Sequence, residues 1–121
     1  MMAPYAETLK RNGIDYDDAM ERFGGNEALF ERLALKFLDD THFTTLEQAL
    51  ADGDVERALR EAHTLKGVAG NLSFTTLYEA ASSVNAALRE GDLAAAAALM
   101  DPVRTAYANV ITALRSLSTQ G

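Results

Sequence analysis

The sequence predicts an all-α fold: an antiparallel up-and-down four-helix bundle with a short N-terminal helical extension. Ala, Leu, Glu and Arg, which favour helices, are abundant in the chain, whereas β-branched residues are few. Apolar side chains recur at helical spacing along four long segments. Short runs with Asp, Gly or Ser separate these segments, and helices joined by short turns pack as antiparallel neighbours.

The length and composition indicate one domain. We expect it to cover residues 1–121, with the bundle core at about residues 26–118. The absence of Cys excludes disulfides and Cys-ligated metals and fits a reducing compartment. The N-terminus lacks a basic start followed by an apolar run, and the longest apolar run, residues 93–100, is too short to span a bilayer. We therefore expect a cytoplasmic protein.

The formal net charge of −7 bears on the kind of partner. Nucleic acids and anionic membranes attract basic faces, so the acidic balance argues against both. The expected partners are proteins with a basic or metal-charged docking face. We expect the chain itself to be a monomer.

Two short helical pieces are predicted before the bundle. Residues 5–11 form either a short helix or a loose segment, and Gly13 ends it because Gly readily takes the left-handed conformation. Asp15 caps a second helix over residues 16–23, with acidic residues in its first turn. The pair Gly24-Gly25 stops that helix.

The first bundle helix is predicted to run from its N-cap, Asn26, to about Ala51. Its middle, residues 39–45, is polar and β-branched, so the helix can bend there, but no residue in it is a firm helix breaker. Asp52-Gly53 forms the following turn. The buried face consists of Phe30, Leu33, Phe37, Leu46, Ala49 and Leu50.

The second and third bundle helices are predicted at residues 55–72 and 76–90. Asp54 caps the second, and either Ser73 or Thr75 acts as the N-cap of the third. Gly91 closes the third helix. The buried faces consist of Val55, Ala58, Leu59, Ala62, Leu65 and Ala69 on the second, and Leu77, Ala80, Ala81, Val84 and Leu88 on the third.

The C-terminal part contains an alanine-rich segment and the fourth bundle helix. Asp92 caps the segment at residues 93–100, and Pro102 sits at a favourable first-turn position. Pro102 either starts a new helix or kinks a continuous one. The helix runs to about Leu117, and residues 118–121 should fray. Its inward face consists of Val103, Tyr107, Val110, Leu114 and Leu117.

His63 lies at the edge of the core face of the helix predicted at residues 55–72, or beyond that edge. It is roughly 100° from Ala62, and Arg60, Gly67 and Gly70 fall on the same outer side. A glycine inside a helix costs about 1 kcal/mol relative to Ala. A side chain at these glycines would therefore block either approach to the imidazole or close packing against a neighbouring helix.

This pattern is compatible with nucleophilic chemistry at His63. A neutral imidazole can attack phosphorus, and the cations Lys66 and Arg60 would favour the charge on a transferred phosphoryl group. The alternatives are that His63 is a plain surface residue, that Lys66 is only solvated, and that Gly70-Asn71 is a fraying helix end. Gly67 lies well inside the helical pattern and fits these alternatives least.

Other residues give weaker indications. We interpret His42 as structural or solvated, and Tyr78, Tyr107 and the phenylalanines as core. A metal site shared by His42 and His63 is the alternative, but Arg60 stands where a Glu-x-x-His pair would need a carboxylate. We find no Gly-rich phosphate loop, no Ser/His/Asp arrangement and no paired carboxylates, so we predict no metal site and no small-molecule enzyme.

Three stretches resemble the histidine phosphotransfer (HPt) domain family. The most specific is Ala62-His63-x-Leu65-Lys66-Gly67 followed by Asn71-Leu72. The runs Arg22-Phe23-Gly24-Gly25-Asn26-Glu27-x-Leu29-Phe30 and Ala49-Leu50-x-x-Gly53-Asp54 are also typical of these domains. The resemblance covers about residues 13–117. One departure is Ser73, where the family usually has Gly; Ser would be modestly strained if the site needs a positive φ.

The resemblance implies a four-helix bundle that acts as a phosphorelay intermediate. His63 would accept a phosphoryl group from an aspartate on a response-regulator receiver domain and pass it to another receiver. Lys66 would assist electrostatically and Gly67 would keep His63 accessible, while Arg60, Thr64 and Gly70 would contact the partner. Such a chain is a stoichiometric carrier without a cofactor, since the receiver supplies Mg²⁺.

The partners and the biological setting are less defined. Receiver domains are the implied partners, together with a hybrid sensor histidine kinase. The early Met and compact ends favour a free-standing protein over a fragment of a larger kinase. The alternative function is an interaction module that binds a receiver or kinase without being phosphorylated, in which case His63 would be dispensable.

Overall fold

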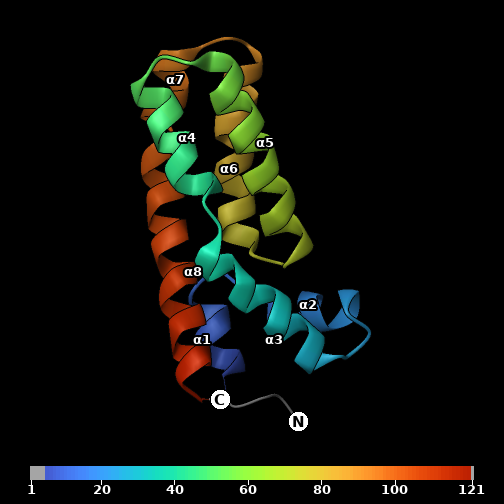
Figure 1. The fold of residues 1–121 in the computed structure, drawn as a ribbon. Helices are drawn as coiled ribbons and strands as arrows, with labels where there is room; N and C mark the ends of the chain where they lie inside the picture. Colours follow the sequence, from blue (N-terminus) through green and yellow to red (C-terminus); the bar gives the residue numbers. More distant parts are fainter. Residues whose placement is uncertain (1–4, 121) are drawn as a thin grey trace.

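The computed structural model describes residues 5–120, and all regular structure in that range is helical. Four long helices pack side by side as the predicted bundle (Figure 1). Residues 1–4 and 121 lie outside the described residues, and residue 121 is the last of those that we expected to fray. The bundle helices are α4 (His42–Ala51), α5 (Val55–Asn71), α6 (Thr75–Arg89) and α8 (Met100–Gln120).

Helix α5 packs against both α4 and α6. Its first turn is capped as predicted, with the Asp54 side chain accepting from the N–H of Arg57 at 3.1 Å. Ala58, Ala62, Leu65 and Ala69 are fully buried. Three of these four are alanines, so neighbouring helices can approach closely on this face. The opposite side of α5 is left for solvent and partners.

The N-terminal extension consists of α1 (Ala6–Arg11), α2 (Tyr16–Arg22) and α3 (Glu27–Lys36). Helices α1 and α3 pack against α8, and α2 lies against both of them (Figure 1). The predicted caps are confirmed: Asp15 accepts from the N–H of Asp18, and Asn26 from that of Leu29. Residues 6–11 are helical rather than loose.

The prediction of one helix from Asn26 to about Ala51 is wrong. Helix α3 ends at Lys36, a 3₁₀ turn η1 (Phe37–Asp39) follows, and Asp40 is extended with ψ of 134°. The Asp40 carboxylate accepts from the N–H of His42 at 2.8 Å and so satisfies a first-turn donor of α4. An Asp side chain that bonds nearby backbone can end a helix without Gly or Pro.

The turn between α5 and α6 also differs from the prediction. Neither Ser73 nor Thr75 caps α6; Phe74 precedes it and Thr75 is its first residue. The N–H of Phe74 bonds to the carbonyl of Ala69 and that of Ser73 to Gly70, the pattern of a Schellman motif. That motif needs a left-handed residue after the helix, and Ser73 takes φ of +59°. The positive φ considered for Ser73 is thus confirmed.

The C-terminal part resolves the alternatives at Pro102. Helix α7 (Leu93–Ala98) is capped by Asp92, and α8 starts at Met100 as a new helix two residues before Pro102. Helix α8 extends to Gln120, so residues 118–120 are helical where we expected fraying. No helix in residues 5–120 is long and apolar enough to cross a membrane.

The aromatic residues pack mainly in the core, with one exception. Tyr107 is half-buried and stacks on the buried Phe43 with ring centroids 4.1 Å apart. Phe37 packs edge-on against Phe74 at 5.2 Å and ties η1 to the start of α6. Tyr78, which we predicted to be core, is 39% exposed. Its ring lies close to Gly70 on the neighbouring helix.

Candidate functional site

His63 is exposed on α5 and lines two hollows in the surface. We name the first the α2 cleft; its volume is about 640 Å³. The second, the α6 hollow, has a volume of about 670 Å³. The α2 cleft is lined by Asp15, Asp18, Arg22, His63, Lys66, Gly67, Ala69, Gly70, Asn71, Ser73, Thr75 and Tyr78. The α6 hollow is lined by Glu56, Leu59, Arg60, His63, Thr64, Lys66, Asn85 and Arg89.

The two glycines after His63 have different reasons to be glycine. A Cβ at Gly67 would meet nothing within 4 Å, so no contact in the described residues requires Gly there. A Cβ at Gly70 would lie 3.0 Å from Cδ1 of Tyr78, tighter than ordinary packing allows. Of the two explanations that the sequence left open, close packing therefore applies to Gly70. Close packing does not account for Gly67.

The other predicted site residues are divided between the two hollows. Lys66 is half-buried and lines both, as His63 does. Arg60 is exposed in the α6 hollow beside the half-buried Thr64. The Thr64 hydroxyl donates to the carbonyl of Arg60 at 3.1 Å, so its proton is used within its own helix. Gly70 lies in the α2 cleft, covered by Tyr78.

Basic side chains gather around His63 although the chain is acidic overall. Four of the eleven Lys and Arg residues line the two hollows, in a chain of net charge −7. Three carboxylates also line them, one of which pairs directly with an arginine. This local excess of cations attracts anionic groups on a partner to the surface around His63. The four cations are Arg22 in the α2 cleft, Arg60 and Arg89 in the α6 hollow, and Lys66 in both.

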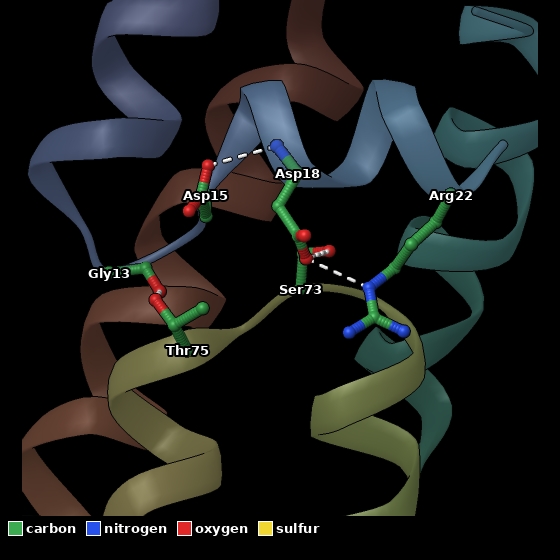
Figure 2. Close-up of polar contacts among 6 residues, drawn as sticks. All are labelled: Gly13, Asp15, Asp18, Arg22, Ser73 and Thr75. Atoms are coloured by element: carbon green, nitrogen blue, oxygen red, sulfur yellow. Dashed lines mark hydrogen bonds and ion pairs between the residues drawn. The ribbon is translucent and has the colours of Figure 1, made fainter. Parts of the chain in front are cut away.

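A polar network joins α2 to the end of α5 at one wall of the α2 cleft (Figure 2). The Asp18 carboxylate accepts from Nε of Arg22 at 2.8 Å and from the Ser73 hydroxyl at 2.7 Å. These bonds, that from Arg22 first, lower the pKa of the Asp18 carboxyl below its usual range. The same bond raises the pKa of Arg22. Thr75 adds a bond to the carbonyl of Gly13 at 3.3 Å.

Asn85 and Arg89 of α6 were not singled out from the sequence, yet they line the α6 hollow with His63. Asn85 is only 4% exposed, and within residues 5–120 its Oδ1 has no hydrogen-bond partner. A buried carbonyl without a partner is costly and calls for a reason. Asn85 follows Val84, which belongs to the predicted buried face of this helix. A polar residue at the edge of that face was the sequence signal that could have pointed to Asn85.

His42 contacts a carboxylate of α5. Its Nδ1 lies 2.5 Å from Oε2 of Glu61, the residue that reaches it from α5. This agrees with the interpretation of His42 as structural. Among the residues that the structure describes, no three His, Asp or Glu side chains gather where they could hold a metal ion.

The comparisons with known proteins give one match. A family model described as Hpt domain matches residues 37–117, which is more than half of the 121 residues. The match includes α4 to α7 and most of α8, whereas α1, α2 and α3 precede it. No curated protein and no solved structure matches the sequence.

Proposed function

This chain belongs to the Hpt domain family, and from that premise we propose that His63 is the residue that carries the phosphoryl group. Membership implies histidine phosphotransfer in a phosphorelay with receiver domains as partners. The observation that carries the assignment to His63 is its exposure on α5 between two hollows, next to a glycine without a packing role.

The proposed reaction is a reversible transfer between an aspartate and His63. A ring nitrogen of neutral His63 attacks the phosphorus of the receiver's aspartyl phosphate, an N–P bond forms, and the acyl O–P bond breaks to release the carboxylate. A second receiver's aspartate reverses the step. Each transfer moves one phosphoryl group without net hydrolysis, so the chain is a stoichiometric carrier.

The surroundings of His63 supply charge and access in this proposal. Lys66 lines both hollows and is placed to favour the negative charge of the transferred group, with Arg60 adding to the same field. Gly67 leaves space for the receiver to approach the imidazole. Thr64 and Gly70 belong to the contact surface, Gly70 by allowing Tyr78 to cover it.

We further propose the setting in which this carrier works. Residues 1–121 act as one domain and as a monomer in the cytoplasm. The chain needs no cofactor of its own, and Mg²⁺ is supplied by the receiver. The receiver that donates and the one that accepts are separate partners, and a hybrid sensor kinase can carry the donating receiver.

A transfer assay tests this function. A receiver domain phosphorylated on its aspartate with ³²P is mixed with the wild-type chain, with His63→Gln and with His42→Gln. We expect acid-labile label on the wild type and on His42→Gln, none on His63→Gln, and passage of that label to a second receiver. Equal label on all three variants would exclude His63 as the carrier. Receiver binding without label on any of them would favour a plain interaction module.

A further inference from the structure

Arg22 of α2 lines the same cleft as His63, although it lies before the segment that matches the family. Its Nε is held by Asp18 at 2.8 Å. Within residues 5–120 no hydrogen-bond partner is found for its two terminal guanidinium nitrogens, and the side chain is 50% exposed. Figure 2 shows the guanidinium beyond Asp18, over the end of α5. Donors are therefore available on the cleft side.

Two hydrogen bonds, which we call the buttress, restrain the side chain of Arg22. Asp18 holds Nε, and Asp18 itself is held by the hydroxyl of Ser73, which is 1% exposed. Ser73 occupies the left-handed position of the Schellman motif, where glycine would have no hydroxyl to offer. Because the buttress restrains the side chain, less rotational freedom is lost when Arg22 binds a partner.

We propose that Arg22 is a receiver-docking residue that binds a carboxylate on the receiver's face beside the phosphorylated aspartate. A guanidinium with two free terminal nitrogens matches a carboxylate with two parallel hydrogen bonds. The α2 cleft is continuous with the His63 surface, so a receiver seated over His63 also covers Arg22. This inference rests on the proposed function, and it assigns to α2 a part of the docking surface.

Comparing two phosphodonors distinguishes an effect on receiver docking from an effect on the chemical step. The first is the receiver domain that transfers fastest to this chain, varied in concentration; the second is phosphoramidate, a small donor that needs no docking. Arg22→Ala is compared with Arg115→Ala, which removes the same charge from an exposed position on α8 outside both hollows. Circular dichroism melting of each variant reports the fold.

We expect Arg22→Ala to raise the half-saturating receiver concentration roughly fivefold or more. The limiting rate and the labelling by phosphoramidate should stay at the wild-type level, and Arg115→Ala should behave as wild type. An unchanged half-saturating concentration would overturn the inference. So would an equal loss with both donors, because that points to the chemical step or to the fold instead of docking.

Binding to a chain that cannot be phosphorylated separates this inference from the proposed function. Receiver affinity is measured with His63→Gln and with the double variant His63→Gln/Arg22→Ala. Weaker binding of the double variant supports docking by Arg22 even if His63 proves not to be the phosphoacceptor. Equal affinity of the two contradicts docking by Arg22 even if His63 carries the label.

Discussion

At the scale of single residues, two features near His63 contribute little to the fold. Gly67 has no packing reason to be glycine, and Asn85 holds a buried carbonyl oxygen without a partner in residues 5–120. Both features cost stability. Such costs concentrate where a protein must bind or react, so the local sequence around His63 fits function better than it fits folding.

The first prediction concerns access at Gly67. Gly67→Ala should raise the free energy of unfolding by about 0.5–1 kcal/mol, because Ala favours the helix and its Cβ meets nothing. Gly67→Leu should slow receiver-dependent transfer at least about tenfold by displacing the receiver from the imidazole, with helicity retained. Unfolding followed by circular dichroism measures the change in stability and the retained helicity. Phosphotransfer kinetics measure the change in rate.

Gly70→Ala is the matched control for Gly67. Its Cβ would press on the Tyr78 ring at 3.0–3.1 Å, so it should not share the gain in stability. A wild-type transfer rate in Gly67→Leu would contradict the steric account.

The second prediction concerns Asn85, which lines the α6 hollow with His63. Asn85→Leu keeps the side-chain volume and removes the unpartnered carbonyl, so the free energy of unfolding should stay the same or rise by about 1 kcal/mol. If the amide holds the imidazole in place for attack, transfer should slow even though the fold is no weaker. Urea unfolding and transfer kinetics decide the matter, and unimpaired transfer would leave Asn85 without a role at the site.

At the scale of elements, the turn between α5 and α6 connects the N-terminal extension to the site. Ser73, which stands where the family usually has Gly, adopts a left-handed conformation, and its hydroxyl donates to Asp18 of α2. The sequence shows the unusual Ser but not its partner 55 positions earlier, because side-chain contacts between distant segments leave no periodic signal. The same holds at Asp40, whose carboxylate accepts from the N–H of His42 at the start of α4, in a stretch where apolar spacing alone would continue one helix.

The third prediction uses Ser73 to separate strain from hydrogen bonding. Ser73→Ala and Ser73→Gly both lose the hydroxyl bond to Asp18, but only Gly relieves the positive φ. The Gly variant should therefore be more stable than the Ala variant by about 1 kcal/mol. Thermal unfolding of the pair measures this difference. Equal stability would mean that the backbone at Ser73 changes when the hydroxyl is lost.

The fourth prediction concerns the pH dependence of the tie between α2 and α5. The pKa of Asp18 is lowered in the folded chain by Arg22 and then Ser73. Its stabilising effect is therefore fully present above the ordinary aspartate pKa of about 3.9 and is lost as the pH falls through the lower folded value. The stability difference between wild type and Asp18→Asn should be constant near neutral pH and shrink below about pH 4. A difference that does not change with pH would show that the carboxylate charge is not what matters.

At the scale of the whole molecule, the bundle could be predicted because it follows from local rules. Apolar spacing located α5 and α6 to within one residue at each end, and Asp15, Asn26, Asp54 and Asp92 were all found to cap helices as expected. The hollows beside His63 could not be predicted, because they are formed by side chains from α2, α5 and α6 that meet only in the fold. The approach of the Tyr78 ring to Gly70 could not be predicted for the same reason.

The central claim is that His63 carries the phosphoryl group, and phosphorus NMR of the phosphorylated chain tests it most directly. The chain has two histidines, so an N–P resonance has only two histidine sources. After reaction with a phosphorylated receiver, we predict one phosphohistidine resonance in the wild type and in His42→Gln, and none in His63→Gln. A resonance that persists in His63→Gln and vanishes in His42→Gln would contradict the account.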